Sequence, residues 1–162
     1  MIKNLSELGE NLQSIVKRLL ANQTLVKYLY YTSKDPLSEP DLTSDEIKNE
    51  IYQKLIKIVP KIDPQEMARS IIALKVERGL KNSNNSEFKD ILLKIEVLVP
   101  ITQWFVKSDN LRPFIIMGEI QKTLEGKTIN GLGKISGGDF AINFITEEMT
   151  AYEMSFRFTS YD

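Results

Sequence analysis

Two alternating stretches, IIALKVE at residues 71–77 and ILLKIEVLV at residues 91–99, decide the fold of this chain. Apolar side chains recur at every second position in each stretch, which places them on one face of an extended strand. Residues 79–87 lie between the stretches and are rich in Gly, Asn and Ser, which suit a turn. The pattern predicts a long β-hairpin with a polar tip.

The second strand of this hairpin is expected to extend beyond its alternating part. Pro100 follows it directly, and a proline cannot donate a ladder hydrogen bond, so an edge position or a bulge is predicted there. The apolar residues that come next predict that the strand continues to Trp104 and Val106.

Helical periodicity precedes the hairpin. Apolar residues at three- and four-residue spacing predict a long amphipathic helix over residues 4–31. Asn4 is the expected N-cap, and Glu7 completes a capping box. Asn22 falls inside the apolar stripe, so a break or kink is predicted near residues 21–23.

A second helix is predicted after the turn-forming residues 32–43. Thr43 or Ser44 is the expected N-cap of this helix. Its apolar residues keep helical spacing through about Ile58, and Pro60 is expected to end it.

The C-terminal part of the chain predicts one helix and several strands. The helix spans Arg112 to Leu124, with Pro113 in its first turn and Gly126 as the glycine just after its end. The strands are expected at residues 132–135, 140–145 and 150–158, with turns at Gly137-Gly138-Asp139 and Glu147-Glu148. The last strand places four apolar side chains on one face: Tyr152, Met154, Phe156 and Phe158.

This order of elements predicts a single α+β domain over residues 1–162. Residues 1–60 form its helical N-terminal part, and residues 68–162 form a ββαββ core. Helices and strands are segregated along the chain instead of alternating as βαβ units. The expected architecture is an antiparallel β-sheet with the N-terminal helices and one central helix packed on one face.

The composition narrows the possible functions. The 162 residues contain no Cys and no His, which excludes disulfides, thiolate metal sites and histidine acid–base catalysis. Lys plus Arg number 21 and Asp plus Glu number 22, so the net charge of -1 gives no strong general attraction to nucleic acid. The first residues do not resemble a signal peptide, and no apolar run is long enough to span a bilayer.

The short motifs that suggest catalysis lack the context they need. Gly126-Lys127-Thr128 resembles the end of a phosphate-binding loop, but here a helix precedes it and a strand follows. Gly131, Gly133, Gly137 and Gly138 have the wrong spacing for a dinucleotide loop, and hairpin turns explain them better.

A nuclease that uses carboxylates and Mg²⁺ remains an alternative. Glu87-Phe88-Lys89 and Glu125-Gly126-Lys127 both match the short Glu-x-Lys pattern, and Asp90 lies beside the first. Magnesium needs converging carboxylates, and nothing else clearly converges on either motif. The expectation is therefore no catalytic residue, no cofactor and no metal site.

The remaining candidate surfaces are polar or aromatic. Lys17-Arg18 and Lys54 to Lys57 lie on polar helix faces, and Trp104-Phe105 is one aromatic pair, for which core packing is expected. The hairpin tip at residues 79–87 is either a mobile loop or an arm that becomes ordered on a neighbouring subunit.

The segment from about Ile71 to Phe158 resembles the tail-terminator and neck (head–tail joining) proteins of tailed bacteriophages. The resemblance lies in the hairpin with its long tip, in Trp104-Phe105-Val106, in the helix that starts LRPFIIMGEI at residue 111, and in the closing strands with GLGKI at residues 131–135. It covers just over half of the chain.

The resemblance implies a non-catalytic virion protein that is assembled in the host bacterial cytoplasm. Such proteins form a homo-oligomeric ring, commonly a hexamer, that contacts tail-tube or connector proteins and surrounds passing DNA without reading its sequence. The closing strand, with Phe156-Arg157-Phe158, is a candidate edge for joining subunits. An adaptor that acts on a protein partner is the first alternative, and the nuclease is the second.

Overall fold

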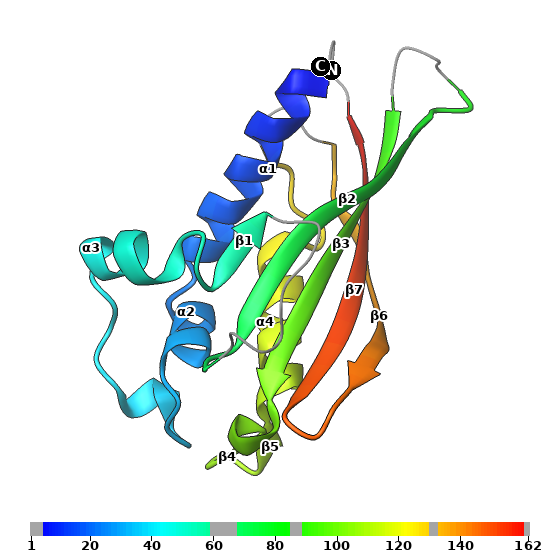
Figure 1. Ribbon diagram of the computed structural model, residues 1–162. Coiled ribbons are helices and arrows are strands. Elements are labelled where there is room, and N and C mark those ends of the chain that lie inside the picture. The colour runs from blue at the N-terminus through cyan, green and yellow to red at the C-terminus, as the bar shows by residue number, and fades with distance from the viewer. Residues whose placement is uncertain (1–4, 59–67, 85–88, 130–132, 161–162) are drawn as a thin grey trace.

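The computed structural model describes residues 5–58, 68–84, 89–129 and 133–160. Its main feature is a five-stranded sheet with the order β1-β2-β3-β7-β6, covered by helices on one face (Figure 1). The strands of this sheet are β1 (Ile56–Ile58), β2 (Ile71–Lys81), β3 (Lys89–Pro100), β6 (Ser136–Ile145) and β7 (Met149–Ser160). A separate ribbon pairs β4 (Phe105–Val106) with β5 (Asn110–Leu111).

Helices both precede and follow the β2–β3 hairpin in the sequence. The α-helices are α1 (Leu5–Leu20), α2 (Gln23–Tyr30), α3 (Ser44–Glu46) and α4 (Arg112–Leu124). Shorter turns are the 3-10 helices η1 (Pro36–Ser38) and η4 (Ile101–Gln103) and the π-helical turn η2 (Ile47–Ile51). The predicted α+β class is confirmed, but the sheet is mixed, because β1 runs parallel to β2.

The core lies between the sheet and the helices α1, α2 and α4. Fully buried side chains meet there from every layer, including Ile15, Leu19, Leu25, Leu29, Leu74, Leu93, Ile116, Ile120 and Phe156. The opposite face of the sheet carries ion pairs and a small apolar cluster of Leu98, Met149 and Ala151. There Lys94 lies 3.5 Å from both Glu77 and Glu153, and Lys75 lies 3.1 Å from Glu153. This division follows from the period-two pattern of the strands.

The predicted break in the first helix is confirmed at Asn22. Its side chain accepts a hydrogen bond from the backbone N–H of Leu25 and so caps α2. The same side chain donates to Glu119 and Thr123 of α4, each at 3.0 Å. The break therefore joins the N-terminal helices to the central helix, while the expected capping by Asn4 lies outside the described residues.

The second predicted helix begins as expected but ends early. Thr43 and Glu46 form a reciprocal capping box, with the Thr43 N–H donating to the Glu46 carboxylate at 2.7 Å. The helical turns then stop at Ile51, and Gln53 has a positive φ of 61°. The extension to Ile58 is wrong because residues 56–58 form β1, which pairs with residues 72–74. The expected stop at Pro60 lies outside the described residues.

The predicted hairpin is confirmed, but β3 does not continue past Pro100. That proline is the last residue of a central strand and not an edge residue, and it pairs with Met149 of β7. The chain then enters η4, where the Ile101 N–H donates to the Glu148 carbonyl oxygen. Proline lacks the N–H that a longer ladder would need.

The C-terminal third confirms one helix and two strands. The helix from Arg112 to Leu124 and the turn at Glu147-Glu148 match the structure, and the two later predicted strands lie inside β6 and β7. Two predictions are wrong. Gly137-Gly138-Asp139 is not a turn but part of β6, and residues 133–135 make only an isolated bridge through Lys134 to Thr128.

Gly137 allows β6 to bulge where it meets β7. Its φ is +123°, and the pairing register shifts between Gly137 and Asp139. A Cβ added there would lie 2.5 Å from the Ser155 carbonyl oxygen, whereas a Cβ on Gly118 in α4 would meet nothing within 4 Å. Only the first glycine is therefore required by the fold.

We expect Gly137→Ala to lower the free energy of unfolding by about 2 kcal/mol or more, because strain and a backbone clash act together. Gly118→Ala is the matched control, and it should stabilise the helix by about 0.5–1 kcal/mol. Urea unfolding curves of the two variants measure both effects. Equal stabilities of the two variants would contradict the assigned bulge.

Candidate assembly surface

Strand β6 forms a long free edge of the sheet. It stands at the end of the strand order and pairs with β7, and no other strand in the described ranges pairs with it (Figure 1). The other edge, β1, has only three residues, whereas β6 has ten. A long edge strand presents backbone N–H and C=O groups that a strand from another chain can pair with.

Apolar side chains project from this edge strand into solvent. Phe140 is 56% exposed, Ile142 is 50% exposed and Ile145 is 66% exposed. The pairing register places Phe140 opposite Met154 and Ile142 opposite Tyr152 on β7. Met154 is buried, so these side chains lie on the face that the helices cover elsewhere, and the helix layer leaves them open at the edge.

Aromatic rings from three elements meet beside β6. The Phe114 ring of α4 lies 6.2 Å from the Phe140 ring and 5.5 Å from the Tyr152 ring, centroid to centroid. The Tyr152 and Phe140 rings lie 6.1 Å apart. Separations of this size are typical of favourable edge-to-face and tilted aromatic pairs. We call Phe114, Phe140, Ile142, Ile145 and Tyr152 the β6 patch.

The predicted aromatic pair at Trp104-Phe105 divides between the core and the surface. Trp104 packs against the core, lies 6.4 Å from the Tyr152 ring and donates a 2.7 Å hydrogen bond from its indole N–H to the Thr150 hydroxyl. Phe105 is instead 71% exposed, so core packing is wrong for this residue. Trp104 therefore packs beside Tyr152 and supports this ring of the β6 patch.

The predicted candidate edge at Phe156-Arg157-Phe158 is wrong. These residues belong to β7, which lies between β3 and β6. The order of strands in a sheet is set by which strands pair and can differ from their order in the sequence. Here β7 is the last of these strands in the sequence, but it lies inside the sheet. The edge available for joining subunits is β6.

The short catalytic motifs are not brought together. Gly126, with a φ of +73°, follows the end of α4, and the Glu125 carboxylate accepts a hydrogen bond from Gln121. The Asp90 carboxylate accepts from the Asn82 amide, while Glu87 lies outside the described residues. Within the described ranges, no group of three or more Asp and Glu side chains is arranged to hold a metal ion.

Of the two predicted polar helix faces, Lys17-Arg18 is confirmed, but the helix face at Lys54 to Lys57 is wrong, because these residues lie in a turn and in β1. Lys17 and Arg18 are exposed in the last turn of α1, and Lys54 makes a loose 3.9 Å pair with Glu50. None of the helices in the described part of the chain is long and apolar enough to cross a membrane. Of the predicted polar tip, residues 79–84 are described, and they extend the hairpin beyond the body of the sheet.

Sequence reasoning missed the role of Arg112, which it treated only as a helix start. Its side chain is fully buried, and its guanidinium donates to the carbonyl oxygens of Gln103, Tyr28, Tyr31 and Ser33 at 2.6–3.0 Å. It also lies 5.6 Å from the centre of the Tyr28 ring. Burial lowers the pKa of this guanidinium, and the neighbouring Tyr28 opposes that shift.

Arg112 joins the start of α4, which carries Phe114 of the β6 patch, to α2 and η4. Its carbonyl partners lie in α2, in the loop after α2 and in η4, while its own backbone begins α4. A planar group with five donors is well suited to satisfying several carbonyl oxygens at once. The only signal in the sequence was an arginine directly before Pro113, which does not indicate burial.

Comparison with known proteins gives a family and a shared fold. A model of the YomW family matches residues 22–158, which is most of the chain. Among solved structures, a chain from the virion of a native gene transfer agent particle shares the fold with a TM-score of 0.56 and 11% sequence identity. The alignment covers 94% of this chain and 96% of that chain. No curated protein matches in sequence. The family match runs from the start of α2 into β7, well over half of the chain, and the chain therefore belongs to the YomW family.

Proposed function

We propose that this chain is a structural protein of a phage-type virion and that it assembles with copies of itself as a ring at the neck or head-proximal end of a tail. The observation that carries the proposal is the β6 patch along a free edge strand. A monomer that remained alone in solution would expose this apolar edge to water and to aggregation. A neighbouring subunit that covers the edge removes both costs.

Two further findings support this function. The shared fold extends over nearly the whole of a chain from a gene transfer agent virion, so the resemblance is not confined to one motif. On the open face of the sheet, Lys75 and Lys94 are paired with Glu153. The net charge of -1 is compatible with a channel past which DNA moves without being held. On this proposal the protein acts by contact and resides in the virion.

Light scattering after size-exclusion chromatography tests the ring. We expect a species several times the 18.6 kDa mass of one chain, with about six times that mass for a hexamer. Negative-stain electron microscopy of the same fraction should show closed rings. A protein that stays monomeric at high concentration and fails to bind purified tail-tube or connector proteins would remove the support for this function. A monomer that binds one unrelated protein would favour the adaptor instead.

A further inference from the structure

We propose that a basic groove at the base of the β2–β3 hairpin accepts the β6–β7 turn of a second copy of this chain. This inference rests on the proposed function, because it assigns the two sides of the contact between neighbouring subunits. The two surfaces lie at opposite ends of the sheet and carry opposite charge.

The groove lies where the hairpin leaves the body of the sheet. It encloses about 420 Å³. The pairing register places Arg78 of β2, Leu92 of β3 and Arg157 of β7 in one row across the sheet. Lys134, just before β6, lines the same groove. Three cationic side chains from distant parts of the sequence therefore converge there.

These cations have no acidic partner within the described part of the chain. Arg78, Lys134 and Arg157 are all exposed, and none of them makes an ion pair there. The one carboxylate that lines the groove, Asp90, accepts hydrogen bonds of 3.0 and 3.3 Å from the Asn82 amide. Three cations against this one carboxylate leave the groove with an excess of positive charge.

The groove also has an apolar component. Leu92, Ile91 and Phe158 are buried and contribute to its lining, and Leu80 stands 53% exposed at its side. A site made only for phosphate would need no exposed leucine. A basic groove with an exposed leucine at its side is better matched to a peptide segment that carries both acidic and apolar side chains.

The β6–β7 turn is such a segment. Ile145 is 66% exposed, and the next residues include Glu147 and Glu148, both exposed and without an ion pair within the described ranges. The Thr146 hydroxyl accepts hydrogen bonds from the backbone N–H groups of Glu148 and Met149. The turn therefore has a fixed shape before any partner arrives, which lowers the entropic cost of binding.

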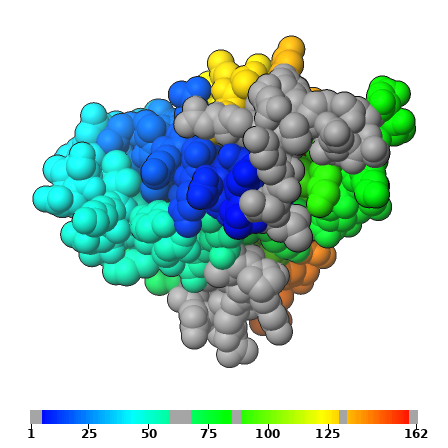
Figure 2. All heavy atoms as spheres, turned by 90° about the horizontal axis from the view of Figure 1, so that it is seen from above, coloured from blue at the N-terminus to red at the C-terminus, as the bar shows by residue number. Residues whose placement is uncertain are grey.

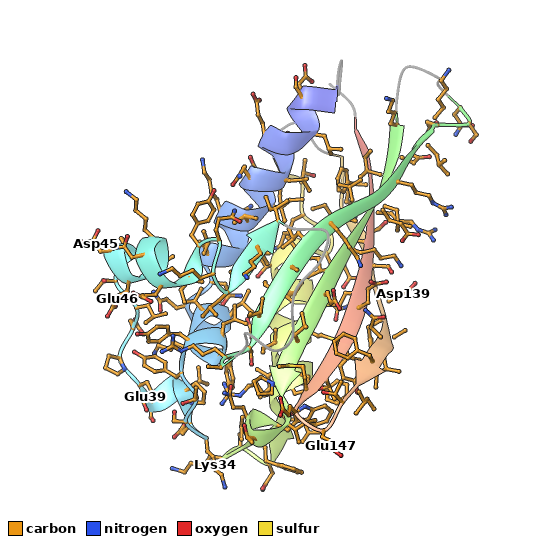
Figure 3. The ribbon with its side chains drawn as sticks, viewed as in Figure 1. Lys34, Glu39, Asp45, Glu46, Asp139 and Glu147 are labelled. Carbon is orange, nitrogen blue, oxygen red and sulfur yellow. The ribbon has the colours of Figure 1, made fainter. Side chains whose placement is uncertain are left out.

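The turn and the groove lie too far apart to meet within one chain, so the contact has to form between two copies. The turn joins the far ends of β6 and β7, whereas the groove contacts Ser136 and Arg157 at the other end of the same two strands. Figure 3 shows Glu147 at the end of the sheet opposite to the one at which β2 ends. Figure 2, seen from above, shows the hairpin projecting on one side while the helical part lies on the other.

A contact between two different surfaces on identical chains is heterologous, so it continues from copy to copy until it closes into a ring. The turn directly follows the β6 patch in sequence, so the acidic and apolar parts of one subunit face form a continuous surface. The groove that receives this surface belongs to the neighbouring subunit. The chain's net charge of -1 does not oppose this pairing, because the attraction is local.

Charge reversal tests the pairing. Arg78→Glu with Arg157→Glu, or Glu147→Arg with Glu148→Arg, should each weaken self-association by about tenfold or more, measured by sedimentation velocity. An equimolar mixture of the two double variants should restore association, because each groove then meets a turn of opposite charge. Lys17→Glu with Lys48→Glu is the matched control, since it reverses two exposed lysines elsewhere and should leave association unchanged. Circular dichroism melts confirm that all variants fold.

The proposal is overturned if both reversed variants associate like the control, or if the mixture fails to recover. It is also overturned if Arg78→Glu with Arg157→Glu leaves self-association intact and instead abolishes binding of a fluorescein-labelled DNA duplex, which would make the groove a phosphate site. In both cases the wild-type protein still forms multimers, so the proposed function survives. A wild-type protein that never associates would overturn both.

Discussion

Replacing Arg112 with methionine is expected to lower the free energy of unfolding by about 3–5 kcal/mol, a large fraction of the stability of a domain of this size. The loss arises because four backbone carbonyl oxygens share this one guanidinium. Methionine fills much of the same volume but donates no hydrogen bond. Buried carbonyl groups left without a donor cost far more than an exposed contact.

Urea unfolding of Arg112→Met beside Arg18→Met measures this effect. Arg18 is exposed in α1, so its replacement should change stability by no more than about 0.5 kcal/mol. The stability loss of Arg112→Lys should lie between those of the other two variants. An ammonium keeps the charge, but it lacks the planar guanidinium that reaches four carbonyl oxygens. A loss below about 1 kcal/mol in Arg112→Met would show that water or neighbouring groups satisfy the carbonyl oxygens instead.

The parts of the fold that local sequence determines were predictable. The hairpin of β2 and β3 follows from alternation, and α4 follows from its periodicity, with Pro113 near its start and Gly126 after its end. The break at Asn22 was also visible, because a short polar side chain inside an apolar stripe prefers to cap a helix. Each of these features depends on residues close together in the chain.

The features that depend on distant residues were not predictable from the same patterns. Residues 56–58 continue a helical spacing and become β1 only because β2 offers them a parallel partner. Gly137 and Gly138 suit a turn in isolation, yet they form a bulge against Ser155 and Phe156. Local propensity is a weak guide where tertiary pairing supplies more hydrogen bonds.

The candidate surface was hidden for a related reason. Phe140 and Ile142 alternate as core residues do, and only the strand order shows that they lie at an open edge. Arg78, Lys134 and Arg157 are far apart in sequence, so no motif joins them before the sheet is assembled. Charge and apolar patterns predict which side chains share a strand face, but not which strand ends the sheet.

The double substitution Phe140→Thr with Ile142→Thr is expected to abolish assembly while leaving the monomer folded. Both side chains are at least half exposed, and threonine retains a strong preference for strands. The monomer should therefore lose about 1 kcal/mol or less for each change. Hot-spot residues at the centre of an interface contribute about 2 kcal/mol or more each, so the loss of two of them weakens association by about a thousandfold.

Leu37→Thr provides the matched control for this surface test. Leu37 is 52% exposed in η1, so Leu37→Thr removes the same kind of side chain at similar exposure but away from β6. Light scattering across a dilution series should show multimers for wild type and for Leu37→Thr, and monomers for the double variant. If all three assemble alike, the subunit contact does not use the β6 patch. If only the double variant dissociates and its thermal unfolding stays close to that of wild type, the loss belongs to the interface and not to the fold, because an unstable monomer would melt earlier.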